Sequence, residues 1–184
     1  SSDVCSSDLL WYQESRCIMP LPSTMTPIAT TTLGSANSTI TFSSISASYT
    51  DLVLVINAFA TSSTDYIQIR INSDTGTNYS NTAVYGDGTS ALSSRVSNQT
   101  FGYLSWTQNI AANGRIVIAS FQNYSNTTTY KTWLNRSSDA AYGTDAIVGL
   151  WRSTSAITTL EIKRTSGGNF NSGSTFTLYG IKAA

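Results

Sequence analysis

Apolar and polar residues alternate over many short stretches of this chain. The clearest example is Tyr66–Ile71 (YIQIRI), where three isoleucines fall on one side of a strand and Gln68 and Arg70 fall on the other. Asp51–Ala60 (DLVLVINAFA) is almost continuously apolar, which predicts a strand buried on both faces. Both patterns are typical of β-structure.

Further strand patterns recur between clusters of turn-forming Gly, Asn, Asp and Ser residues. No convincing amphipathic helix appears, although one short helical turn near Ser90–Val96 fits the pattern. We predict an all-β fold of about nine to eleven short strands in an antiparallel, jelly-roll-like β-sandwich. The other predicted strands are Ser38–Phe42, Arg115–Phe121, Tyr130–Asn135, Ala146–Trp151, Ile157–Arg164 and Thr175–Ile181, with weaker candidates at Ile28–Leu33, Asn81–Tyr85 and Phe101–Trp106.

The opening residues, SSDVCSSDLL, fit neither a strand nor a helix period. They lack the basic region and apolar core of a secretory signal. SSDVCSSDL instead resembles the translation of sequencing-adapter DNA that is found fused to gene predictions from metagenomic assemblies. We therefore interpret residues 1–18 as a non-native leader, with a disordered natural tail as the alternative, and predict one domain over residues 19–184.

Composition excludes several chemistries. The chain has no histidine, and both cysteines, Cys5 and Cys17, lie in the leader. Disulfides, Cys-based or Ser-His-Asp catalysis and ordinary zinc sites are therefore not expected in residues 19–184. Nine scattered basic and seven acidic residues in that range give no basic patch for nucleic acid, and no apolar run is long enough to insert in a membrane. Ser, Thr and Asn together supply 70 of the 184 residues, which predicts a largely uncharged, hydrated surface.

Carboxylates give little support for catalysis. Glycosidases usually use two carboxyl groups, but the predicted domain has one glutamate, Glu161, in a strand pattern that turns it to solvent. Asp65 with Asp74 remains open as a pair, although turn formation is the more ordinary role for both. Asn72–Asn78 (NSDTGTN) spaces oxygen side chains as calcium loops do but lacks the closing glutamate, so we interpret it as a turn. We expect no catalytic residue, metal site or cofactor.

Aromatic residues are the most suggestive group. Aromatic rings stack on sugar rings, and Asn and Asp bind sugar hydroxyls, so an exposed cluster could bind a glycan. Trp106 is the best candidate for an exposed ring, and Tyr103, Asn109 and Tyr124 complete the candidate site. Packing in the core or at a subunit interface is the alternative for aromatic residues in general, and it is the reading we favour for Trp133 and Trp151.

Several segments together resemble a group of small phage virion proteins known from environmental viral sequences. They are MPLPSTMTPIATTTLGSANSTITFSSI from Met19, YTDLVLVINA, IQIRINSDTGTNYS and the final STFTLYGIKAA. The likeness spans roughly residues 19–184 and lies in the style of strands and turns. It implies a β-sandwich module on the particle surface, in a tail fibre, spike or capsid decoration, and it carries no catalytic motif.

Our leading hypothesis is therefore a non-enzymatic virion structural protein. We expect it to form a homo-oligomer such as a trimer, to contact other virion proteins and to touch host surface glycans. The alternative is a free-standing carbohydrate-binding module that uses exposed aromatic residues. A hydrolase is the third and weakest hypothesis.

Overall fold

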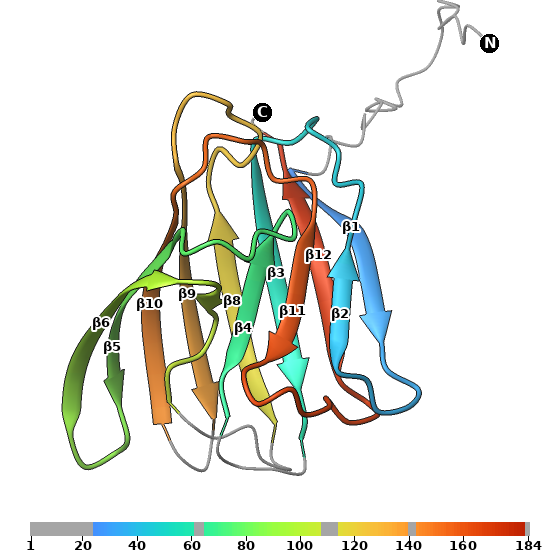
Figure 1. Cartoon of the computed structure of the whole chain (residues 1–184). Helices are drawn as coiled ribbons and strands as arrows, with labels where there is room; N and C mark the ends of the chain where they lie inside the picture. Colours follow the sequence, from blue (N-terminus) through green and yellow to red (C-terminus); the bar gives the residue numbers. More distant parts are fainter. Residues whose placement is uncertain (1–23, 61–64, 108–113, 140–142, 183–184) are drawn as a thin grey trace, which may run out of the picture.

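Two antiparallel β-sheets form the protein, as seen in a computed structural model that describes residues 24–60, 65–107, 114–139 and 143–182 (Figure 1). The larger sheet has eight strands in the order β1-β12-β3-β8-β9-β10-β5-β6, and the smaller has four in the order β2-β11-β4-β7. The strands are β1 Met25–Thr32, β2 Thr39–Phe42, β3 Asp51–Ala58, β4 Ile67–Ile71, β5 Tyr79–Gly86, β6 Ala91–Gln99, β7 Gly102–Tyr103, β8 Arg115–Phe121, β9 Lys131–Asp139, β10 Gly143–Trp151, β11 Leu160–Arg164 and β12 Thr175–Ile181.

Eight of these strands form nested antiparallel pairs. β1 pairs with β12, β2 with β11, β3 with β8 and β4 with β7. The pairs fall alternately in the larger and the smaller sheet, as if one long hairpin had been rolled into two layers. This is the arrangement of a double-sheet jelly roll, so the predicted all-β, jelly-roll-like sandwich is confirmed.

Two inserted hairpins make the larger sheet wider than the smaller one. β5 and β6 lie between β4 and β7 in the chain, and β9 and β10 lie between β8 and β11. Together they add β9-β10-β5-β6 beside β8 in the larger sheet. The left side of Figure 1 shows these strands extending beyond β4. The inserted hairpins therefore supply about half of the larger sheet.

The core lies between the sheets and consists of alternate side chains from both. In β3, Leu52, Leu54 and Ile56 are fully buried, whereas Val53 and Val55 on the other face are only half-buried. The prediction that this strand is buried on both faces is therefore wrong, because no third layer covers the outer face of the larger sheet among the described residues.

Segment β6 also differs from its prediction. Ala91–Gln99 is a strand paired with β5, not a turn of helix over Ser90–Val96. Its sequence, ALSSRVSNQ, contains only three apolar residues, none of its residues is buried and most are exposed. Hydrogen bonding to β5, rather than burial of an apolar face, therefore defines this edge strand.

Trp133 in β9 occupies a slot made by two glycines. The Trp133 side chain is 1% exposed. A Cβ atom placed on Gly149 of β10 would lie 1.9 Å from the Trp133 ring, and one on Gly102 of β7 would lie 2.3 Å from it. Only glycine fits at either position while the ring stays in place. Trp151 is also buried, so the core interpretation of both tryptophans is confirmed.

Candidate functional site

An aromatic cluster surrounds β7 at one edge of the smaller sheet. The ring of Tyr103 meets Tyr66, Phe101 and Trp106 edge-to-face, with centroid separations of 5.5, 5.1 and 4.9 Å. Edge-to-face contacts of this kind stabilise one another beyond the area they bury. All four rings are partly exposed, so the cluster is held in place and still reaches solvent.

Hydrogen bonds from the larger sheet hold this segment of the chain. The Tyr103 N–H donates to Oδ1 of buried Asn81 on β5 at 3.0 Å. The N–H groups of Trp106 and Thr107 both donate to Oδ2 of Asp145 on β10, at 2.9 and 3.1 Å. The inserted hairpins thus fix the position of the aromatic cluster.

Asp145 belongs to a buried ion pair. Its Oδ2 atom lies 3.2 Å from Nη1 of Arg115 on β8, and neither side chain is exposed. Ser137 bridges the pair, donating to Asp145 Oδ1 at 2.6 Å and accepting from Arg115 Nη1 at 2.8 Å. Burial lowers the pKa of Arg115, an effect that the carboxylates of Asp145 and Asp139 oppose. Since the pair is sealed from solvent, its role is to join β8, β9, β10 and the segment after β7.

The four residues of the predicted glycan site lie in different parts of the structure, and one lies outside the described residues. Trp106 and Tyr103 do come together in the aromatic cluster. Asn109 lies outside the described residues. Tyr124 is fully buried, and its hydroxyl donates to the Ser46 carbonyl oxygen, so it is removed from the candidate glycan surface because a core ring cannot meet a sugar.

Sequence reasoning missed two members of the cluster. Tyr66 comes directly before the alternating strand β4, and Phe101 lies two residues before Tyr103. The spacing of Phe101 and Tyr103 puts them on one side of an extended segment, which is a signal that could have been read. Tyr66 joins them only because β4 pairs with β7.

The acidic candidates have structural partners. Asp65 contacts Nε of Arg164 at 2.9 Å. Burial raises the pKa of the Asp65 carboxyl, but hydrogen bonds from Ser166, Thr165 and Tyr66 outweigh burial and lower it. Asp74 accepts hydrogen bonds from Gly76, Asn78 and Trp151, as expected for a turn.

These two aspartates do not form a catalytic pair. They flank β4, whose five residues span roughly 16 Å at ~3.3 Å each. Paired glycosidase carboxyls lie about 5–9.5 Å apart. Within the described ranges, no group of three or more acidic, His or Cys side chains is placed to hold a metal ion. There is likewise no helix in those ranges that is long and apolar enough to cross a membrane.

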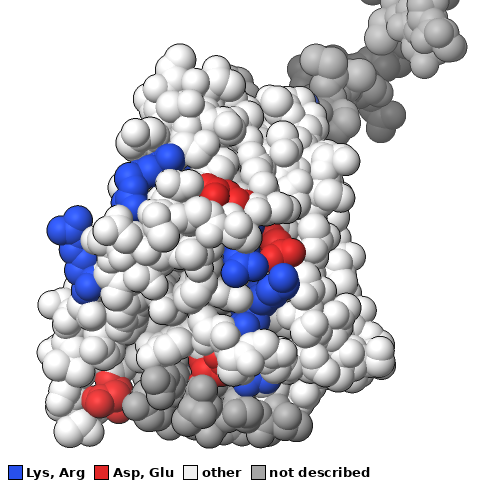
Figure 2. Space-filling view, in the orientation of Figure 1, with Lys and Arg blue, Asp and Glu red and all other residues white. Residues whose placement is uncertain are grey.

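The outer faces of the two sheets differ in charge. On the smaller sheet, Glu161 of β11 lies 2.8 Å from Nζ of Lys163 and 3.8 Å from Nη1 of Arg70. Figure 2 shows basic and acidic side chains close together on this side of the molecule, within a mostly uncharged surface. Such a face suits contact with water.

The outer face of the larger sheet is apolar over its middle strands. Ile116, Leu134, Val148 and Val84 are 52–58% exposed although all are large and apolar. They alternate with core residues along their strands, as the burial patterns show. We call this surface the apolar face; it comprises Ile116 and Ile118 of β8, Leu134 of β9, Ala146 and Val148 of β10, and Val84 of β5.

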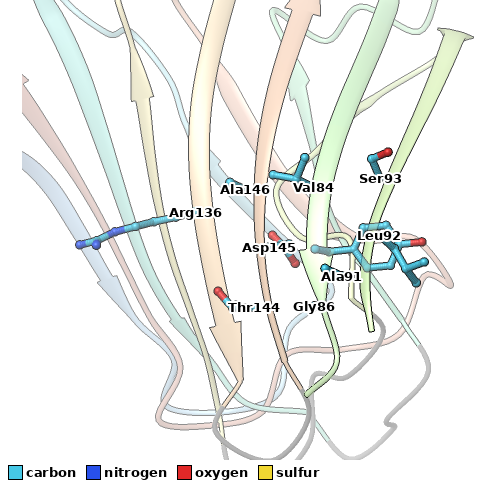
Figure 3. Close-up of a pocket in the computed structure, with 10 residues that line it drawn as sticks. Val84, Gly86, Ala91, Leu92, Ser93, Arg136, Thr144, Asp145 and Ala146 are labelled. Atoms are coloured by element: carbon cyan, nitrogen blue, oxygen red, sulfur yellow. The ribbon is translucent and has the colours of Figure 1, made fainter. Parts of the chain in front are cut away.

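A shallow hollow adjoins the apolar face beside the β5–β6 hairpin. It has a volume of about 630 Å³ and is lined by residues of β5, β6, β9 and β10. In Figure 3, Val84 and Ala146 lie next to each other, whereas Arg136 extends away from both. The hollow is open to solvent.

Two comparisons with known proteins found no match to this chain. No protein-family model matches it, and no curated protein matches it either. The case for a function therefore rests on the residues and surfaces described above.

Proposed function

We propose that this protein is a non-enzymatic structural protein of a phage virion, acting as a tail-fibre, spike or capsid-decoration module on the particle surface. The observation that carries the proposal is the apolar face, which leaves four large aliphatic side chains more than half exposed. Contiguous exposed apolar patches mark protein–protein contacts. A jelly roll is also a common architecture of viral capsid and lectin domains, although a fold by itself does not determine function.

Assembly is the physical role that these features support. The module forms a homo-oligomer, for which a closed trimer is one arrangement, and contacts other virion proteins. The resemblance noted in the sequence points to the same role. No nucleic acid, membrane insertion or cofactor enters this proposal.

Antibody labelling tests the proposal directly. An antibody raised against the purified protein should decorate the surface of intact viral particles whose genome encodes this chain, as seen by electron microscopy. Particles that remain unlabelled, while the antibody still binds the purified protein, would contradict a position on the virion surface. Turnover of glycoside or ester substrates by the purified protein would contradict the non-enzymatic assignment.

A second candidate function, carbohydrate binding, is favoured by the aromatic cluster. Its four rings are partly exposed, and hydrogen bonds to Asn81 and Asp145 hold the backbone of Tyr103 and Trp106. Preorganised aromatic rings lose little entropy on binding. The cluster could serve a virion protein that touches host glycans or a free-standing binding module.

Glycan binding is measured with Trp106→Ala and a matched control. Tyr130→Ala removes an aromatic ring that is 57% exposed and lies just before β9, at the other end of that strand from the Asp145 network. Saturable binding to a glycan array that falls at least tenfold in Trp106→Ala but not in Tyr130→Ala supports the candidate. Equal loss in both variants, or no binding by the wild type, contradicts it.

A further inference from the structure

The apolar face extends over four neighbouring strands, with Arg136 and several Ser and Thr side chains between its members. Leu134 of β9 is paired directly with Val148 of β10, and Ala146 of β10 is paired with Val84 of β5. Side chains of directly paired residues lie on the same face, about 4.5–5.5 Å apart at Cβ. Arg136 of β9 separates Ile118 of β8 from Ala146 along their row, but Ile118, Leu134 and Ala146 line one shallow hollow. The exposed aliphatic groups therefore form one surface, not isolated positions.

The whole outer surface of the four strands that carry the apolar face has the size of a protein interface. Four strands about 4.8 Å apart, each contributing about seven residues at ~3.3 Å, cover roughly 450 Å² of flat sheet before the relief of the side chains is counted. Two such faces in contact would remove on the order of 1,000 Å² of surface from water, the lower bound for a specific interface. Contact with a small ligand would leave most of this area exposed.

The chemistry of the face selects the kind of partner. Among the described residues of these four strands, Arg136 is the one charged side chain on the outer side. A nucleic acid would require many basic groups, and a glycan would require aromatic platforms, which the apolar face lacks. An aliphatic sheet surface is instead the complement of a second aliphatic sheet surface, because sheets stack at about 10 Å through interdigitated side chains.

Charge also favours a second copy of this chain. Residues 19–184 carry nine basic and seven acidic residues, a formal net charge of only +2. Molecules with little net charge do not repel one another, and near-zero charge promotes self-association. The outer face of the smaller sheet carries Arg70, Glu161 and Lys163 and is the less favourable surface to desolvate.

The geometry points to a homotypic interface in which the apolar face packs against the apolar face of a second copy. This inference rests on the proposed structural function and assigns the surface that joins two copies; because a self-complementary contact closes as a dimer, a trimer would need a different surface. The inserted hairpins β5–β6 and β9–β10 supply three of the four strands, so they are the part of the fold that makes self-assembly possible.

Light scattering of the full-length protein over a range of concentrations tests the interface. Leu134→Asp and Val148→Asp place a carboxylate at two exposed, directly paired positions. Each should raise the dissociation constant of the oligomer at least tenfold, since a desolvated charge without a partner opposes association. Met25→Asp is the matched control, because Met25 is an exposed apolar residue on β1 at the opposite edge of the same sheet.

A second variant distinguishes a weakened interface from a misfolded protein. Leu134→Thr with Val148→Thr keeps β-forming residues in both strands and should also weaken association, with unchanged circular dichroism. A wild-type protein that stays monomeric at all concentrations overturns the inference, as does an oligomer that Leu134→Asp leaves intact or that Met25→Asp dissociates equally. These results are distinct from particle labelling, which succeeds or fails independently of which surface joins the copies.

Discussion

The Tyr79 hydroxyl provides a buried polar contact to three backbone groups. It accepts a hydrogen bond from the Ile71 N–H at 3.0 Å, and it lies 3.3 Å from the carbonyl oxygens of Ile71 and Asp74. The side chain is completely buried, and burial raises the pKa of Tyr79 to about 12. Tyr79 therefore stabilises the turn between β4 and β5 through hydrogen bonds made inside the core.

Stability should therefore fall at alkaline pH. An unfolded tyrosine loses its proton near pH 10, whereas Tyr79 in the folded protein keeps it to about pH 12. Because the unfolded state binds fewer protons between these values, the free energy of unfolding decreases there, by about 2–3 kcal/mol in total. Urea unfolding at pH 8, 10 and 11 measures this loss.

Tyr79→Phe separates this contribution from that of other groups. The variant should be about 1–3 kcal/mol less stable at pH 8, because the buried Ile71 N–H loses its acceptor. Its stability should also decline less between pH 10 and 11 than that of the wild type. Parallel pH profiles for the two proteins would refute the role given to Tyr79.

At the scale of elements, the Trp133 ring and two glycines determine how β9, β10 and β7 pack together. Trp133 fills the space above Gly149, its direct partner in β10, and also that beside Gly102. The indole Nε1 lies 3.4 Å from the Tyr103 carbonyl oxygen. The inserted hairpin β9–β10 is thereby fastened to the edge of the smaller sheet.

Gly149→Ala should consequently destabilise the fold. The new methyl group would overlap the Trp133 ring, and overpacking of this kind costs about 1–3 kcal/mol. Gly34→Ala is the control, since nothing lies within 4 Å of a Cβ at that position. Thermal unfolding should show a lower midpoint for Gly149→Ala only, with partial recovery when Trp133→Phe is added. Equal unfolding midpoints for both glycine variants would contradict the claim that the Trp133 ring requires glycine at position 149.

At the scale of the whole molecule, the two outer faces predict how association responds to salt. Contact through the apolar face depends on hydrophobic burial, which sulfate strengthens by exclusion from the protein surface. Contact through Arg70, Glu161 and Lys163 would instead be screened by sodium chloride. The two kinds of salt therefore distinguish the faces.

Sedimentation in the two salts provides the measurement. The oligomer should persist in 1 M sodium chloride and should form at lower protein concentration in 0.5 M ammonium sulfate, conditions chosen from the screening and exclusion effects of these salts. Dissociation by sodium chloride would indicate association through charged groups and would contradict assembly by the apolar face.

The sequence was most informative where a strand has one buried face and clear turn residues at its ends. Arg115–Phe121 and Thr175–Ile181 were predicted with the bounds that the structure has. The edge strand Ala91–Gln99 was missed because hydrogen bonding to β5 defines it, whereas its own sequence shows no regular alternation of apolar and polar residues. Alternation of apolar and polar residues identifies a strand when one of its faces is buried, and β6 has no buried residue.

The candidate site was less predictable because burial and strand pairing, which a local sequence pattern does not show, decide which residues it contains. Trp106 and Tyr103 are near in sequence and were grouped correctly, but Tyr124 was assigned to a surface although it lies in the core. The Asp145 network joins residues from β8, β9 and β10 that only strand pairing brings together. No spacing rule in a single sequence reveals such long-range partners.

The nesting of the strands has a consequence for how the chain reaches this structure. Thr30 of β1 and Thr177 of β12 are hydrogen-bonded although 147 positions separate them, and β12 lies between β1 and β3 in the sheet. During synthesis on a ribosome, β1 therefore cannot pair with β12, its one neighbour among the described strands, until almost the whole of this sequence has emerged. Pairings between such distant segments form slowly. During synthesis, the unpaired edges of β1 and β3 are exposed to neighbouring nascent chains, and the tendency to aggregate should be greatest before β12 arrives.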